Sequence, residues 1–176
     1  MTTDSTDIDT QIAAKIVQIN AQIEEAAKAH NREPNHIKLL AVSKTKPVSD
    51  IMLAYEMGQR SFGENYVQEG VEKIQFLQDV SDLEWHFIGP LQSNKTAQAA
   101  AQLDWVQSVD RLKIASRLSA QRPDELPNLN ICVQVNISGE ASKAGVAVEQ
   151  LDELLPQIAE LPKLTLRGLM AIPAAH

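Results

Sequence analysis

The first part of the chain carries apolar residues at three- and four-residue steps, which is the spacing of an amphipathic helix. The stripe consists of Ile8, Ile12, Ile16, Ile19, Ile23 and Ala27. Thr6 or Asp7 is expected to cap this helix, and Pro34 predicts that it ends near Asn31. Residues 1–5 are expected to form a disordered tail.

Beyond this helix, short apolar runs of strand length alternate with segments of helical period. The predicted strands are residues 37–42, 60–62, 84–88, 104–109, 129–136 and 164–170. The predicted helices between them are residues 50–57, 67–78, 96–101, 111–120 and 148–161. Ser49 is expected to cap the first of these helices, Gly58 to end it, and Pro156 to kink the last. This alternation implies right-handed crossovers and predicts an α/β fold with a parallel sheet.

Two architectures accept six such strands, an open doubly wound sheet and a (β/α)₈ barrel. The open sheet normally has a glycine-rich turn after its first strand, whereas residues 43–47 contain no glycine. Polar residues instead follow successive strands, which is how a barrel builds a site at the carboxyl ends of its strands. We therefore favour a TIM-type (β/α)₈ barrel. Such a barrel has eight strands in roughly 250 residues, so this chain would stop two strands short.

Composition narrows the classes of function. The 176 residues carry a formal net charge of −7, and 44% of them are hydrophobic. We therefore expect a soluble protein that does not capture nucleic acid. The single cysteine, Cys132, and the dispersed histidines have no metal-ligand spacing, so we expect no metal. The chain shows neither a signal peptide nor a membrane-spanning stretch, which favours a cytoplasmic protein.

The stretch most informative for chemistry is residues 39–47 (LLAVSKTKP), in which an apolar strand runs into Lys44 and Pro47 closes it. An apolar wall behind Lys44 would lower its pKa and expose a free amine, the form that attacks an aldehyde. The alternative is that Lys44 and Lys46 are two solvated lysines, which is the more common situation for strand-end lysines.

Several motifs together resemble the YggS/PROSC family of pyridoxal phosphate homeostasis proteins. They are residues 40–47 (LAVSKTKP), 62–69 (FGENYVQE), 85–95 (WHFIGPLQSNK), 135–138 (VNIS), 142–145 (SKAG) and 166–172 (LRGLMAI). They occur in family order from about residue 37 onward.

The resemblance implies a single pyridoxal-phosphate-binding barrel domain over residues 1–176, similar to the barrel of alanine racemase (fold type III) with an extra N-terminal helix. It also implies that Lys44 holds pyridoxal 5'-phosphate as a Schiff base, and that Asn65, His86 and Met170 lie at the cofactor. The family holds the phosphate mainly with a Ser-rich loop and a Gly-Thr turn beyond the sixth strand. This chain has neither segment, so we expect a C-terminally incomplete barrel with open strand edges.

Most of these residues also have a structural interpretation. Asn65 is either a helix N-cap or a cofactor contact, and Glu64 could be a charge at the helix start. His86 points away from the neighbouring Trp85 and Phe87, and is either a hydrogen-bonded core histidine or a ring contact. Further residues expected to be structural or solvated are Arg111, Cys132, Ser142 and Lys143.

The resulting hypothesis is a pyridoxal phosphate carrier in intracellular homeostasis, not an enzyme, with no catalytic residues assigned. Its expected partners are pyridoxal phosphate and the apoenzymes that depend on it, with no nucleic acid and no membrane, and we expect a monomer. One rival is a racemase, which needs a second acid/base group, often Tyr. Tyr55 and Tyr66, in or beside predicted helices, look poorly placed for that role. The other rival is a truncated scaffold that no longer retains the cofactor.

Overall fold

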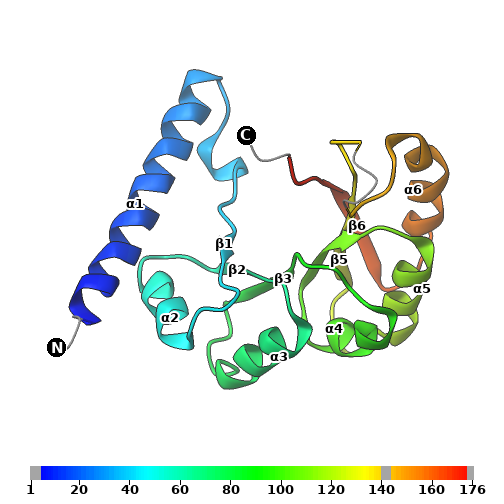
Figure 1. The fold of residues 1–176 in the computed structure, drawn as a ribbon, viewed down its shortest axis with the longest axis horizontal. Helices are drawn as coiled ribbons and strands as arrows, with labels where there is room; N and C mark the ends of the chain where they lie inside the picture. The colour runs from blue at the N-terminus through cyan, green and yellow to red at the C-terminus, as the bar shows by residue number, and fades with distance from the viewer. Residues whose placement is uncertain (1–4, 140–143, 174–176) are drawn as a thin grey trace. The chain divides into compact units, whose positions relative to one another are not determined.

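The computed structural model describes residues 5–139 and 144–173. The described chain forms two compact units, unit 1 (Met1–Gly63) and unit 2 (Glu64–His176), each with its own strands and helices (Figure 1). The expected single domain over residues 1–176 stays a prediction. Residues 1–4 of the expected tail and the predicted solvated pair Ser142 and Lys143 lie outside the described residues.

Unit 1 begins with a long helix and contains one pair of strands. Its elements are α1 (Ser5–Ala29), the 3₁₀ helix η1 (Pro34–His36), β1 (Ala41–Val42), α2 (Val48–Glu56) and β2 (Ser61–Glu64), whose last residue begins unit 2. α1 starts at Ser5, so it includes one residue of the expected tail and begins before either expected cap. Ile16 and Ala27 of the predicted stripe lie about three helical turns apart on one face of α1, and both are buried, whereas Ile19 is exposed.

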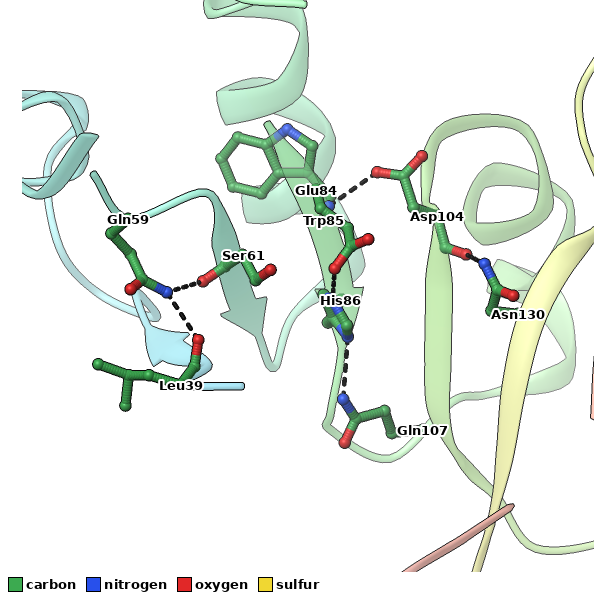
Figure 2. Close-up of polar contacts among 9 residues, drawn as sticks. All are labelled: Leu39, Gln59, Ser61, Glu84, Trp85, His86, Asp104, Gln107 and Asn130. Carbon is green, nitrogen blue, oxygen red and sulfur yellow. Dashed lines mark hydrogen bonds and ion pairs between the residues drawn. The ribbon is translucent and has the colours of Figure 1, made fainter. Parts of the chain in front are cut away.

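β1 is shorter than the strand predicted over residues 37–42. Its two residues pair in parallel with β2, Ala41 with Phe62 and Val42 with Gly63. Upstream, the Leu39 carbonyl accepts a hydrogen bond of 2.8 Å from the Gln59 side chain, which also donates to the Ser61 carbonyl (Figure 2). The Gln59 side-chain amide therefore pairs with a carbonyl that, in the longer predicted strand, would accept from a backbone N–H of the neighbouring strand.

α2 follows directly on the turn after β1, and its start differs from the prediction. Pro47 occupies the N-cap position with an extended backbone, and Ser49 lies inside the helix. Proline is suited to this boundary because its ring fixes φ and it lacks the N–H that a helix start leaves unpaired. Gly58 ends the helix region with φ of 92°, as the sequence predicted.

Unit 2 alternates strands and helices throughout its described length. After the end of β2 come α3 (Val67–Phe76), β3 (Glu84–Phe87), η2 (Ser93–Lys95), α4 (Thr96–Gln102), β4 (Trp105–Val109), α5 (Leu112–Gln121), β5 (Leu129–Gln134), η3 (Val148–Gln150), α6 (Leu151–Ala159) and β6 (Leu164–Met170). β3 pairs with β4, β4 with β5 and β5 with β6, and every pair is parallel. The predicted order of strands and helices is confirmed. The helix predicted over residues 148–161 is divided into η3 and α6, with Pro156 inside α6.

The core of unit 2 lies between its sheet and its helices. On β5, Leu129, Ile131 and Val133 are fully buried and alternate with the half-buried Asn130 and Cys132, as the two-residue period of a strand requires. α3 contacts α4, α4 contacts α5 and α5 contacts α6, so these helices follow one another beside the strands (Figure 1). In the part of the chain that the structure describes, no helix combines the length and apolar content needed to cross a membrane.

Candidate functional site

Lys44 occupies a tight turn at the carboxyl end of β1. The Ser43 N–H donates to the Gly63 carbonyl at 2.9 Å, which continues the β1–β2 pairing by one residue, and the Lys46 N–H donates back to the Ser43 carbonyl at 3.1 Å. Thr45, inside this turn, has φ of 60°. A β-branched residue seldom adopts that conformation, and backbone strain of this kind is common at functional sites.

The Lys44 side chain is exposed. Unit 1 therefore does not form the apolar wall that the sequence suggested behind Lys44. The nearby Val42 is also 53% exposed. The strand does deliver Lys44 to its carboxyl end, and the amine is open to solutes.

Asn65 follows β2 directly and carries a buried acceptor. Its Oδ1 atom is buried and, among the described residues, has no hydrogen-bond partner. The N-cap position of α3 is occupied by Tyr66, so the interpretation of Asn65 as a helix cap is wrong. A buried acceptor without a partner costs roughly 1–3 kcal/mol, which a bound donor would recover.

The backbone of Asn65 is packed against the loop after β3. A Cβ atom built on Gly89 would lie 2.2 Å from the Asn65 carbonyl oxygen, so only glycine fits there. One residue earlier, the Ile88 N–H donates to the Glu64 carbonyl at 2.9 Å. These two contacts fix the end of β2 relative to the end of β3.

Glu64 is held by a lysine that sequence reasoning did not single out. Its carboxylate is fully buried and lies 2.7 Å from the Lys73 ammonium, whose side chain is only 8% exposed. Lys73 also contacts Glu69 at 2.7 Å, one helical turn earlier on α3. The idea that Glu64 is a charge at a helix start is therefore wrong. The Glu69–Lys73 spacing was visible in the sequence, but the nine-residue link to Glu64 was not.

His86 is a hydrogen-bonded core histidine. It is 3% exposed, and its ring nitrogens lie 2.8 Å from Glu84 Oε1 and 2.9 Å from Gln107 Nε2 (Figure 2). A Gln107 amide that donates to Nδ1 leaves the ring proton on Nε2, where it is donated to Glu84. The ring also stacks on Trp105 with centroids 5.0 Å apart. Contact between His86 and a cofactor stays a prediction.

Met170 is the last residue of β6 and is half-buried. It pairs with Gln134, and its carbonyl accepts from the Val135 N–H at 2.8 Å. Within unit 2, the structure thus brings Asn65 beside the loop that follows His86 on β3, and it places Met170 at the end of another strand. Lys44 belongs to unit 1.

Two further expectations concern residues outside the predicted site. Burial raises the pKa of the Cys132 thiol, although the positive charge of Arg167 opposes this, and the raised pKa agrees with an unreactive cysteine. Arg111 occupies the N-cap position of α5, 3.8 Å from Asp110, which agrees with a structural role. The prediction of no metal stays a prediction.

The fold defines the class of protein. A family model for the N-terminal domain of alanine racemase matches residues 16–176. Alanine racemase from Clostridium difficile is similar in structure, with a TM-score of 0.67 over 90% of this chain and 40% of that chain. At 17% sequence identity this likeness concerns the fold alone, and it confirms the predicted barrel type.

Closer relatives narrow the class to one family. The pyridoxal phosphate homeostasis protein of Escherichia coli is 58% identical over 165 residues, which cover 93% of this chain and 70% of that protein. PipY from Synechococcus elongatus, in its structure with pyridoxal phosphate bound, is 39% identical with a TM-score of 0.73, over 86% of this chain and 70% of PipY. The chain belongs to the family of pyridoxal phosphate homeostasis proteins.

Proposed function

We propose that this chain binds pyridoxal 5'-phosphate, holds it as a Schiff base on Lys44, and serves intracellular pyridoxal phosphate homeostasis as a carrier. The observation that carries the proposal is the 58% identity, over nearly the whole chain, to a protein named for that role. The proposed partners are the cofactor and the apoenzymes that receive it, and the proposed setting is a cytoplasmic monomer.

The residues of the chain fit such a group. Pyridoxal phosphate supplies an aldehyde, which condenses with an unprotonated primary amine and releases water. Lys44 supplies an accessible amine at a strand end, and the Ser43–Lys46 hydrogen bond holds the turn that carries it. An exposed amine attached to a fixed turn is suited to a group that must be taken up and handed on.

Asn65, His86 and Met170 are proposed to contribute to binding from unit 2. The strongest support concerns Asn65, because its buried Oδ1 has unused acceptor capacity among the described residues. For His86, the hydrogen bonds that engage both ring nitrogens, Nδ1 as acceptor and Nε2 as donor, support a role in shaping the polar surface of β3 rather than in moving a proton. Met170 is proposed from its place at a strand end.

A carrier is favoured over a racemase by the two tyrosines of the chain. The Tyr55 ring lies in α2 with the Arg60 guanidinium 3.9 Å from its centroid, and Tyr66 is 60% exposed at the start of α3. Neither position supports the role of a second acid/base group. The chain spans 70% of the length of its Escherichia coli relative. A scaffold that does not retain the cofactor is therefore the second alternative that the experiment tests.

The test is a visible absorption spectrum of the purified chain after incubation with pyridoxal phosphate and desalting. Borohydride reduction and peptide mapping then locate the attached group. We expect a retained band that maps to Lys44, is absent in Lys44→Ala and persists in the matched control Lys46→Ala. A folded wild-type chain that remains colourless would refute binding by this chain and favour the scaffold. Racemisation of amino acids by the loaded chain, followed by chiral chromatography, would refute the carrier in favour of the racemase.

A further inference from the structure

We infer that Lys73 is a positioning residue for pyridoxal phosphate binding, because its buried ion pair with Glu64 holds the Asn65 acceptor in place. The inference rests on the proposed function, since it assigns a purpose to a contact that lies one residue away from a proposed cofactor ligand. Lys73 itself is not proposed to touch the cofactor.

The ion pair ties the end of β2 to α3. Glu64 is the last residue of the strand, and its side chain is fully buried against the Lys73 ammonium at 2.7 Å. Glu69 orients the same ammonium from the preceding helical turn at 2.7 Å. Gly70 of α3 packs against the same side chain, where a Cβ would make ordinary van der Waals contact with the Glu64 Cβ at 3.5 Å.

On its other side, the same short segment is held by the end of β3. The Ile88 N–H donates to the Glu64 carbonyl, and the Asn65 backbone lies against Gly89. Residues 64 and 65 are therefore fixed from both directions, by an ion pair through the side chain and by close contacts through the backbone. A buried acceptor that lacks a partner persists only where the surrounding structure determines its position, and Asn65 Oδ1 meets that condition.

Removal of the Lys73 charge would act on Asn65 through Glu64. Without the Lys73 ammonium, the fully buried Glu64 carboxylate loses the positive charge that lies 2.7 Å from it, which favours its protonation or its movement toward water. Because Asn65 is the next residue in the chain, such a shift displaces the acceptor, and the energy of its hydrogen bond to the cofactor is lost. Loss of one such bond corresponds to about a tenfold weaker affinity.

The test measures the dissociation constant for pyridoxal phosphate by absorption titration, together with amide hydrogen exchange of the unliganded proteins. We expect Lys73→Met to weaken binding about tenfold and to accelerate exchange at the Ile88 N–H, which reports the position of residue 64. Lys28→Met is the matched control, since it removes an ammonium from an exposed ion pair of the same four-residue spacing with Glu24. It should leave both readouts unchanged.

A second variant tests whether Lys73 acts through Glu64. Glu64→Gln combined with Lys73→Met removes both charges, so it should be more stable than Lys73→Met alone. Because the inference assigns the loss of affinity to the unpaired Glu64 carboxylate, this double variant should also regain affinity and slow exchange at the Ile88 N–H; affinity that stays reduced although stability is regained would overturn the inference. Wild-type-like affinity in folded Lys73→Met would also overturn it and leave the proposed function intact. A wild-type chain that fails to bind pyridoxal phosphate would refute the proposed function and this inference together.

Discussion

Replacement of Arg122 by methionine should severely destabilise unit 2. The Arg122 residue is 4% exposed and follows α5 at its C-cap. Its guanidinium donates to the carbonyls of Ala100 at 2.7 Å, Leu103 at 2.8 Å and Pro127 at 2.9 Å. One side chain thereby joins the end of α4, the approach to β4 and the loop before β5.

The size of the effect follows from these contacts. A hydrogen bond to a charged group contributes roughly 1.5–3 kcal/mol, so three additive bonds would sum to roughly 5–9 kcal/mol. The Pro127 residue is exposed and its carbonyl can regain water, whereas Ala100 and Leu103 are buried. We therefore expect Arg122→Met to lower the free energy of unfolding by about 3–5 kcal/mol. That is a large part of the roughly 5–15 kcal/mol that stabilises a typical domain.

The assay is equilibrium unfolding in urea, followed by tryptophan fluorescence and far-UV circular dichroism. Arg117→Met is the matched control on the same helix. Arg117 is half-buried, and its Nε atom is shared between the Ser93 carbonyl and the Thr96 hydroxyl, so its loss should cost only about 1 kcal/mol. If Arg122→Met lowers the free energy of unfolding no more than Arg117→Met does, the three carbonyl contacts do not contribute the stability assigned to them.

Three further predictions concern unit 2. Burial raises the pKa of Asp104 above its ordinary value of 3.8, so its ionisation costs stability as pH rises from that value through the folded pKa. Asp104→Asn can keep an acceptor for the Trp85 N–H but cannot ionise. The free energy of unfolding of this variant, relative to that of the wild type, should therefore increase from acid to neutral pH, and urea titrations that show the opposite trend would contradict this. Gly89→Ala should cost about 2 kcal/mol through the clash with the Asn65 carbonyl, a result that unfolding midpoints equal to the wild type would exclude. The Cys132 thiol should react with a disulfide reagent far more slowly in the native chain than in urea, and equal rates would show that burial does not protect it.

The sequence carried most of the information about local structure. Strand-length apolar runs separated by helical patterns predicted the order of elements because each element must bury one face and its period appears in the chain. Errors about helices occurred at their starts, where Pro47 rather than Ser49 is the N-cap of α2 and Tyr66 rather than Asn65 is the N-cap of α3. Helix starts depend on backbone conformation at one or two residues, and several neighbouring residue types are compatible with the same cap.

The proposed site was accessible to sequence reasoning to different degrees. Lys44 was identified because a strand ending in lysine before proline, within family motifs, is a local pattern. Lys73 and Arg122 were not, because their partners Glu64 and Ala100 are 9 and 22 residues away in the chain. Spacings of that kind follow no helix or strand period, so nothing in the local pattern distinguishes these residues from solvated lysines and arginines.

Periodicity and contiguous motifs were enough to predict the α/β alternation, the family and the lysine proposed to hold the cofactor. Which charges are buried and paired could be seen only after the chain was folded. The folded structure showed that His86 is hydrogen-bonded between Glu84 and Gln107, and that Glu64 is held by Lys73 rather than placed at a helix start. The physical reason is that the energy of a charge depends on its distance from other charges and from water, and folding sets those distances between residues that are remote in the chain.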